Sequence, residues 1–260
     1  QKIIQVRIIR STRFMSYLIL GASSGLGREL AYILAKNSND LIIISRDERD
    51  LKAIKSDLEI KFEITVKYFS VDVSSFDETK KFLYSNLNLL SQIQGILFPV
   101  GMMETKDEVL NDMSVSNSLI QANMGAVAYF LSKIFPIFME KNKGIIVGFG
   151  SVSSTIGRDV NAVYAASKRG LESLFETLAI SALPSKLKIQ FYTIGYLDTN
   201  LSYGKKLLLP KGSAKKLAKI VYKNLDKNYR KIYYPSWWAI IVFIIKILPF
   251  SLIRYIYKFL

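Results

Sequence analysis

The sequence of 260 residues contains no cysteine and no histidine. These two absences exclude disulfides, thiolate and imidazole nucleophiles, and most kinds of zinc site, so we expect no metal centre. General acid–base chemistry must then fall to tyrosine, lysine, aspartate or glutamate side chains. The lack of cysteine also fits a reducing compartment.

Acidic residues are scarce as well: 21 aspartates and glutamates stand against 36 lysines and arginines, for a formal net charge of +15. From Gly204 onward, Asp226 is the one acidic residue among more than ten basic ones. A solvated basic face is one interpretation. A nucleic acid partner is another, but no recognised binding module accompanies the charge, and we expect no such partner. An anionic membrane surface fits best, because the same region ends in an apolar tail.

Half of the residues are hydrophobic, which is enough for a substantial core, and the length suits one large domain or two small ones. Residues 1–14 alternate isoleucine, valine and arginine without turn signals, and they resemble no complete signal peptide. We treat them as an extension of doubtful status and begin the folded domain at Met15.

Short apolar runs alternate with helical patterns along most of the chain. Strands are expected over residues 17–20, 41–44, 64–71, 96–98, 144–150, 188–194 and 231–235. Helices are expected over residues 28–36, 50–59, 116–141, 162–183 and 213–228, with another beginning near Ser75. The alternation predicts an α/β fold, a Rossmann doubly wound parallel sheet in a single domain over residues 15–234. Ligands of such sheets bind beyond the carboxyl ends of the strands.

A glycine-rich turn, Gly21-Ala-Ser-Ser-Gly25-Leu-Gly27, follows the first expected strand and leads into a helical pattern. Glycines in this context permit a tight turn and bring a phosphate close to backbone N–H groups at a helix N-terminus. The alternative is an ordinary tight turn between a strand and a helix. Because three glycines and two serines fall together, we favour a dinucleotide site.

Two polar positions at the ends of later strands bear on the cofactor. Arg46 stands where the adenosine ribose of a dinucleotide would lie. An arginine there pairs with a 2′-phosphate, so NADP is favoured over NAD, unless Arg46 pairs with Asp47 or Glu48 instead. Asp72 is placed either to bond the adenine amino group or to cap the next helix.

A tyrosine and a lysine four residues apart, Tyr164 and Lys168, share one face of an expected helix. Ser151 stands thirteen residues before the tyrosine, at the end of the apolar run 145–150. A phenol beside an ammonium is a proton donor whose pKa falls from about 10, which suits proton transfer to or from a substrate oxygen. These three residues are therefore a candidate acid–base site.

Two other pairs have the same spacing as Tyr164 and Lys168. They are Tyr32 with Lys36 and Tyr129 with Lys133. Neither has a serine at the end of a strand thirteen residues earlier. We interpret both pairs as surface or groove residues of helices.

In order and spacing, these motifs resemble the short-chain dehydrogenase/reductase family over about residues 17–228. The resemblance rests on Gly21-x3-Gly25-x-Gly27, Asp72-Val73, Asn123, Ser151, Tyr164-x3-Lys168, and Gly195 followed by Thr199. It implies an oxidoreductase that uses NADPH, with NAD less favoured, to interconvert ketones and secondary alcohols. The cofactor-binding positions that it implies are Gly21, Ser23, Ser24, Gly25, Leu26, Gly27, Arg46, Asp72, Val73, Gly101, Tyr164, Lys168, Gly195 and Thr199.

By the same resemblance, Tyr164 is the general acid that protonates a carbonyl as hydride arrives. Lys168 lowers the pKa of that tyrosine and bonds the nicotinamide ribose. Ser151 fixes the substrate oxygen, and Asn123 holds a water that relays protons to Lys168. The role of Asn123 comes from the resemblance only, since the residue pattern alone indicates a neutral helix residue.

Three positions depart from the family pattern. Leu20 replaces a threonine before the glycine motif, and Ile194 replaces a proline before Gly195. The family's Asn-Asn-Ala-Gly after the fourth strand is Phe98-Pro99-Val100-Gly101 here. The catalytic positions are intact, so we expect activity, whereas the changed loop argues against ordinary acyl-carrier or simple alcohol substrates.

The last part of the chain, residues 235–260, is predicted to be a membrane-associating amphipathic, apolar helix. Its longest uncharged run is shorter than the roughly twenty apolar residues that a membrane span needs. We expect a helix in the membrane interface, bent at Pro249, with Trp237 and Trp238 at headgroup level. One arc of this helix carries its polar residues, Lys246, Ser251, Arg254 and Lys258. Packing of the tail on a partner subunit is the alternative.

The tail indicates a lipidic substrate, reached beneath a lid that we expect over residues 204–210. The pattern Arg158-x4-Val163-Tyr164, the loop Pro99-Val100-Gly101 and the Tyr-Pro-x-Trp tail resemble one subgroup of the family, the decaprenylphosphoryl-2-keto-ribose reductases. The resemblance implies reduction of a keto group on a polyprenyl-phosphate-linked sugar. From the tail we expect a peripheral or monotopic protein on the cytoplasmic side of a membrane.

Other functions fit the same motifs. Reduction of 3-ketoacyl, ketosphingoid or steroid lipids differs only in the pocket, which we place in residues 99–112, 152–161 and 196–212. A non-catalytic NADP-binding membrane scaffold is the alternative from another class, and the intact candidate acid–base residues argue against it. The resemblance further implies a homodimer or homotetramer paired through the helices expected over residues 116–141 and 162–183.

Overall fold

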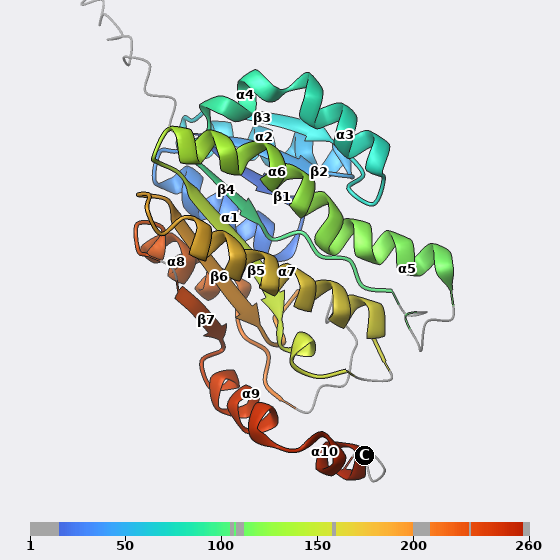
Figure 1. Cartoon of the computed structure of the whole chain (residues 1–260). Coiled ribbons are helices and arrows are strands. Elements are labelled where there is room, and N and C mark those ends of the chain that lie inside the picture. The colour runs from blue at the N-terminus through green and yellow to red at the C-terminus, as the bar shows by residue number, and fades with distance from the viewer. Residues whose placement is uncertain are drawn as a thin grey trace, which may run out of the picture.

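A parallel β-sheet organises the residues that the structure, a computed structural model, describes: 16–104, 107, 112–157, 160–199, 209–228 and 230–256. Within these residues the sheet has seven strands in the order β3-β2-β1-β4-β5-β6-β7 (Figure 1). The strands are β1 (Ser16–Leu20), β2 (Asp40–Ser45), β3 (Val66–Ser70), β4 (Gly95–Phe98), β5 (Ile145–Ser151), β6 (Lys188–Ile194) and β7 (Arg230–Tyr234). Every neighbouring pair runs parallel.

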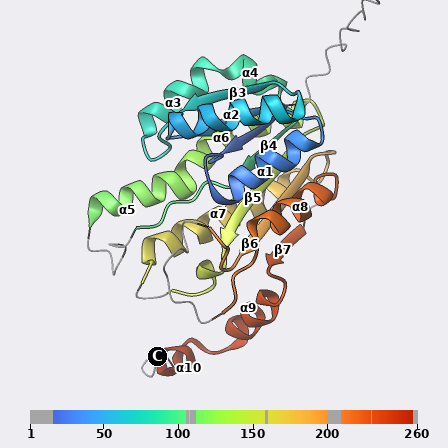
Figure 2. The same ribbon diagram turned by 180° about the vertical axis from the view of Figure 1, so that it is seen from behind.

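Helices cover both faces of the sheet (Figures 1 and 2). One face carries α1 (Gly25–Lys36), α2 (Glu48–Phe62) and α8 (Ala214–Asn224). The other face carries α3 (Phe76–Ser85), α4 (Leu87–Gln92), α6 (Ala126–Glu140) and α7 (Ala162–Ser181). Because both faces are covered, the central strands are continuous apolar runs, and residues 41–44 of β2 are all buried.

The strand order reverses between β1 and β4, which places a crevice at the carboxyl ends of these two strands. The segments after β1, β4, β5 and β6 all emerge at that edge. The predicted single-domain Rossmann fold is thus confirmed. The described part of the chain also contains α4, a short helix that was not predicted.

The long helix expected over residues 116–141 is interrupted at its centre. The structure has α5 (Met113–Ile120), a π-helical turn η1 (Gln121–Gly125) that contains Asn123, and then α6. A wide turn of this kind inside a helix re-aims the side chains that it carries and is frequent at functional sites. By length and mean hydropathy Met113–Glu140 is long and apolar enough to cross a membrane, but the buried side chains of α6 belong to the core beneath the sheet.

The tail forms two helices rather than one. They are α9 (Trp238–Ile247) and α10 (Phe250–Ile256), and they extend beyond the carboxyl ends of the strands (Figures 1 and 2). Leu248 is extended, with ψ 135, because the following Pro249 disfavours a helical conformation in the residue before it. The expectation of one continuous polar arc from Lys246 onward is therefore wrong. The expected extension over residues 1–14 and Lys258 lie outside the described residues.

Candidate active site

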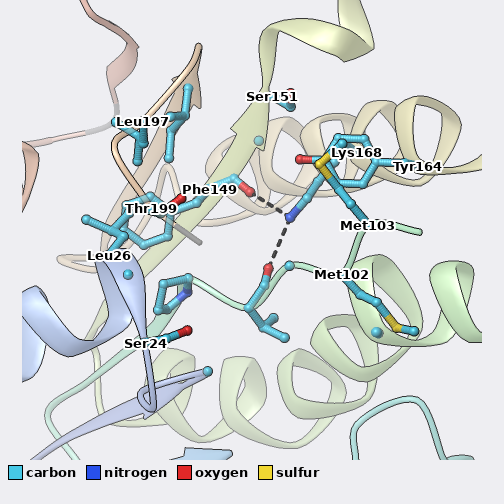
Figure 3. A pocket seen from close by; sticks show the side chains of 18 of the residues that line it. Ser24, Leu26, Met102, Met103, Phe149, Ser151, Tyr164, Lys168, Leu197 and Thr199 are labelled. Atoms are coloured by element: carbon cyan, nitrogen blue, oxygen red, sulfur yellow. Dashed lines mark hydrogen bonds between the residues drawn. The ribbon is translucent and has the colours of Figure 1, made fainter. Parts of the chain in front are cut away.

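A cavity of about 720 Å³ opens at the carboxyl edge of the sheet, and its wall is drawn in Figure 3. Three of the four candidate catalytic residues, Ser151, Tyr164 and Lys168, line it. Most of the expected cofactor-binding residues line it too: Gly21, Ser23, Ser24, Gly25, Leu26, Arg46, Asp72, Val73, Gly101, Gly195 and Thr199. Gly27 and Asn123 lie behind the wall instead. The structure therefore gathers residues from seven separate segments into one cleft.

The glycine-rich turn forms the floor of this cleft. Gly21 has φ +96, and a Cβ there would lie 2.8 Å from the Cα of Val100, so only glycine allows the β1 and β4 segments to approach this closely. Helix α1 begins at Gly25, three residues earlier than predicted, and its N-cap Ser24 makes no side-chain capping bond. The first turn of α1 thus points into the cleft without a side-chain cap.

Arg46 and Asp72 lie together at one end of the cleft. Arg46 Nη1 is 3.9 Å from Asp72 Oδ2, whereas Asp47 pairs with Arg49 and Glu48 with Lys52. Arg46 therefore pairs with neither Asp47 nor Glu48. The Arg46 side chain is 73% exposed, which leaves the guanidinium accessible to a ligand. Asp72 Oδ1 accepts hydrogen bonds from Ser74 N and Ser74 Oγ.

The cap of α3 is a different residue from the one we considered. Ser75 Oγ accepts a hydrogen bond from the backbone N–H of Glu78 at 3.3 Å. Helix α3 itself begins at Phe76, the residue after this cap. The interpretation of Asp72 as a helix cap is therefore wrong, and its carboxylate stays at the cleft wall.

The three candidate acid–base residues come from β5 and α7. Ser151 is the last residue of β5, and its Oγ accepts a hydrogen bond from Ser153 N at 3.1 Å. Tyr164 and Lys168 lie one turn apart on α7, and both side chains reach into the cavity in Figure 3. Lys168 Nζ lies 6.0 Å from the centroid of the Tyr164 ring. The other two Tyr–Lys pairs lie away from the cleft wall, on α1 and α6.

The Lys168 ammonium is buried and held by main-chain oxygens. Its Nζ donates to Val100 O at 3.1 Å and to Phe149 O at 3.2 Å, shown as dashed lines in Figure 3. Burial lowers the pKa of Lys168 to about 8 from its usual 10.5. A lysine in this state exchanges its proton near neutral pH.

Asn123 holds the segment that follows β4. Its Oδ1 accepts a hydrogen bond from Met102 N, and its Nδ2 donates to Met102 O, both at 2.9 Å. The side chain is fully buried. A Cβ on Gly101 would lie 3.7 Å from Lys168 Nζ and 3.8 Å from Asn123 Oδ1, so the lysine and the amide flank the same peptide. The expected water relay through Asn123 stays a prediction.

A buried aspartate that was not predicted to be a site residue lies next to this site. Asp107 Oδ1 accepts a hydrogen bond from Val163 N, and Asp107 Oδ2 accepts one from Tyr164 N, both at 2.9 Å. Its backbone oxygen accepts a third from Asn161 N at 2.8 Å. The side chain lies in a polar segment 57 residues before Tyr164, and no local pattern signals the contact.

Apolar side chains also line the cleft, and the segment after β6 joins it to the tail. Met102, Met103 and Leu197 are among the lining residues. Trp238 of α9 packs against the segment after β6, and its ring lies 5.8 Å from that of Tyr196 in an edge-to-face arrangement. Helix α9 also contacts η2 (Val152–Thr155), which follows Ser151. The lid expected over residues 204–210 lies mostly outside the described residues, as does Arg158.

Comparisons with known proteins agree with this geometry. The profile of the short chain dehydrogenase family matches residues 16–206. The chain is 26% identical over 235 residues to an 11-beta-hydroxysteroid dehydrogenase-like protein of Arabidopsis thaliana, covering 86% of this chain and 75% of that one. It is 28% identical over 192 residues to a very-long-chain 3-oxoacyl-CoA reductase of Debaryomyces hansenii, covering 70% of this chain and 55% of that one.

Solved structures share the fold. A short-chain dehydrogenase from Sphingobium yanoikuyae, solved in complex with NADPH, superposes with a TM-score of 0.77 at 22% identity. The match covers 85% of this chain and 88% of that one. Because the family profile spans most of the described sheet and the cleft residues fall in the family's order, the chain belongs to the short-chain dehydrogenase family and is an NAD(P)-dependent oxidoreductase acting on CH–OH groups.

Proposed function

We propose that this protein uses NADPH to interconvert a ketone and a secondary alcohol on a lipid held at a membrane surface. The observation that carries the proposal is the position of the tail. Helix α9 packs on the segments that border the candidate catalytic residues, and its outer side is apolar and exposed. A lipid drawn from a membrane beneath the tail would therefore enter the cleft from the side that the tail borders.

The cleft suits a dinucleotide phosphate. Its volume of about 720 Å³ lies in the range of cofactor sites. The uncapped first turn of α1 offers backbone N–H groups to a pyrophosphate. The exposed guanidinium of Arg46 is placed to pair with a 2′-phosphate and supports the choice of NADP over NAD. Thr199 closes the cleft opposite the turn, since a Cβ on Gly25 would lie 3.1 Å from Thr199 Cγ2.

In the reduction, the bound nicotinamide supplies a hydride to the carbonyl carbon. Tyr164 gives its phenolic proton to the carbonyl oxygen, so that the ketone becomes an alcohol. The Lys168 ammonium stabilises the phenolate that remains, and it holds this position through the carbonyl oxygens of Val100 and Phe149. Ser151 Oγ accepts its bond from Ser153 N, which leaves the serine proton to be donated to the substrate oxygen. In the reverse reaction, oxidation of the alcohol, the Tyr164 phenolate accepts the proton of the hydroxyl group.

The tail supports contact with a membrane. Ile240, Phe243 and Ile247 share one face of α9, and together with Phe250 they are between 63 and 65% exposed. Exposed large apolar side chains grouped in this way mark a contact surface. With ten residues, α9 is about half as long as a span needs, so a position in the interface fits better. We therefore propose that residues 235–260 associate with the cytoplasmic side of a membrane. The excess of lysine and arginine in the C-terminal part suits anionic lipids.

Two substrate classes have specific support. The sequence features shared with the decaprenylphosphoryl-2-keto-ribose reductases favour a keto-sugar on a polyprenyl phosphate. The names of two relatives, a steroid dehydrogenase-like protein and a very-long-chain 3-oxoacyl-CoA reductase, favour steroid or 3-ketoacyl lipids instead. The apolar wall of Met102, Met103 and Leu197 accommodates a lipid chain in either case.

NADPH oxidation with three lipid ketones tests the proposal: a polyprenylphosphoryl keto-sugar, a 3-ketoacyl thioester and a keto-steroid. We expect turnover of at least one, with the keto-sugar preferred. Tyr164→Phe should bind NADPH as the natural protein does and lose turnover, since the phenol is the proton source. Binding of NADPH without turnover of any ketone would favour a non-catalytic scaffold and reject the proposal.

A further inference from the structure

Helix α7 lacks a cap of its own at the end that carries Tyr164. Its N-cap residue, Asn161, has a left-handed conformation with φ 56 and makes no side-chain capping bond. The first N–H groups of a helix have no partner within the helix and need one from elsewhere. Here the partner is Asp107, which lies in the segment between β4 and α5.

The geometry points to Asp107 as a positioning residue for the candidate catalytic tyrosine. Tyr164 is the third residue of α7, and its own backbone N–H is one of the two that the carboxylate accepts, at 2.9 Å. Asp107 is 4% exposed, so solvent does not compete strongly for these bonds. A carboxylate at a helix N-terminus is also stabilised by the helix dipole.

The contact fixes Tyr164 relative to the wall of the cleft. Asp107 belongs to the same segment as Met102, which Asn123 holds, and as Gly101, which lies beside Lys168. The bonds of Asp107 therefore tie the main chain at Tyr164 to the segment that follows β4. Since small displacements of a reacting group reduce rates strongly, this tie should act on turnover rather than on cofactor binding.

Asp107→Ala tests the inference, which rests on the proposed role of Tyr164. We expect kcat to fall by roughly ten- to a hundredfold, while the KM for NADPH stays the same. Asp107→Asn keeps one acceptor oxygen, so its kcat should lie between that of Asp107→Ala and that of the natural protein. Asp40→Ala is the control, because the Asp40 carboxylate likewise accepts a backbone N–H, that of Thr65, but at the amino end of β2, away from the cleft.

Amide hydrogen exchange gives a second readout that needs no substrate. The amides of Val163 and Tyr164 should exchange about tenfold faster in Asp107→Ala and be unchanged in Asp40→Ala. An unchanged kcat, or an equal fall in both variants, would overturn the inference. If the natural protein turns over no ketone, the proposed function fails, and the exchange rates alone decide whether Asp107 holds Tyr164: faster exchange supports it and unchanged exchange overturns it.

Discussion

Trp238 of α9 lies directly against Gly195, the residue that follows β6. A Cβ on this glycine would lie 1.8 Å from the indole Nε1, so no larger residue fits while the tail is docked. The indole N–H is buried and has no hydrogen-bond partner among the described residues. The contact joins the tail to a wall of the cleft, because Gly195 and its neighbour Tyr196 both line the cavity.

A double-mutant cycle measures this contact. Gly195→Ala should lower the free energy of unfolding by about 1–3 kcal/mol, because the added methyl group overlaps the indole. Trp238→Phe removes the overlapping nitrogen, so the double variant should be more stable than the sum of the single effects predicts, by about 0.5–3 kcal/mol. Trp237→Phe is the control and should give no such recovery. Additive effects in the Gly195 and Trp238 cycle, measured by denaturant unfolding, would contradict the docking of α9.

The amide of Asn123 gives a second prediction. Asn123→Asp keeps an acceptor for Met102 N but faces Met102 O with an oxygen in place of a donor. A buried group left without its partner costs about 1–3 kcal/mol, so unfolding should become easier by that amount and turnover should fall. Asn117→Ala, on the exposed side of α5, should change stability by less than about 0.5 kcal/mol. Equal stability of Asn123→Asp and the natural protein would show that Asn123 does not hold this segment.

The buried ammonium of Lys168 predicts that both the stability of the protein and its binding of NADPH depend on pH. Its pKa is lowered to about 8 by burial, whereas the unfolded chain keeps the usual 10.5. The unfolded state thus binds more protons between these values, and stability should rise with pH from about 8 to 10.5. In the folded protein the ammonium loses its proton near pH 8, which should weaken NADPH binding above that pH. The affinity for NADPH, measured by fluorescence titration at a series of pH values, should fall near pH 8 in the natural protein and show no such fall in Lys168→Met. The same fall in both proteins would contradict the assignment of this pKa to Lys168.

Arg46 predicts the choice of cofactor. Arg46→Asp should lower the ratio of kcat/KM for NADPH over that for NADH by roughly ten- to a hundredfold, since a charge-assisted bond to a phosphate is replaced by repulsion. Arg49→Asp removes an equally charged and more exposed side chain nearby and should leave the ratio unchanged. An unchanged ratio in Arg46→Asp would show that Arg46 does not select NADPH over NADH.

The parts of the fold that rest on local pattern were predictable. Apolar runs and helical spacing located the seven strands of the described sheet within a few residues, and the strand over residues 188–194 agrees at both ends. The spacing of Ser151, Tyr164 and Lys168 identified residues that do lie at one cleft, because a strand end and one helix turn fix their separation.

Contacts between distant segments were not predictable in this way. Asp107 caps a helix that begins 55 residues later, and nothing in its own neighbourhood indicates a cap. The π-helical turn at Asn123 interrupts a run whose apolar spacing predicts one continuous helix. The prediction that Trp238 lies at lipid headgroup level is wrong: it is buried against Gly195, because the first turn of α9 docks on the domain. In each case the partner comes from another part of the chain.

The most direct test is the rate of NADPH oxidation with a polyprenylphosphoryl keto-sugar in anionic vesicles. It compares the natural protein with a variant in which Ile240, Phe243, Ile247 and Phe250 are replaced by serine. We expect the natural protein to reduce the vesicle-bound ketone. The variant should lose that activity but still reduce the same keto-sugar on a short, water-soluble chain, because only the exposed side of the tail is changed. No oxidation of NADPH by the natural protein, or equal rates of both proteins on vesicles, would contradict a reductase that takes its substrate from a membrane.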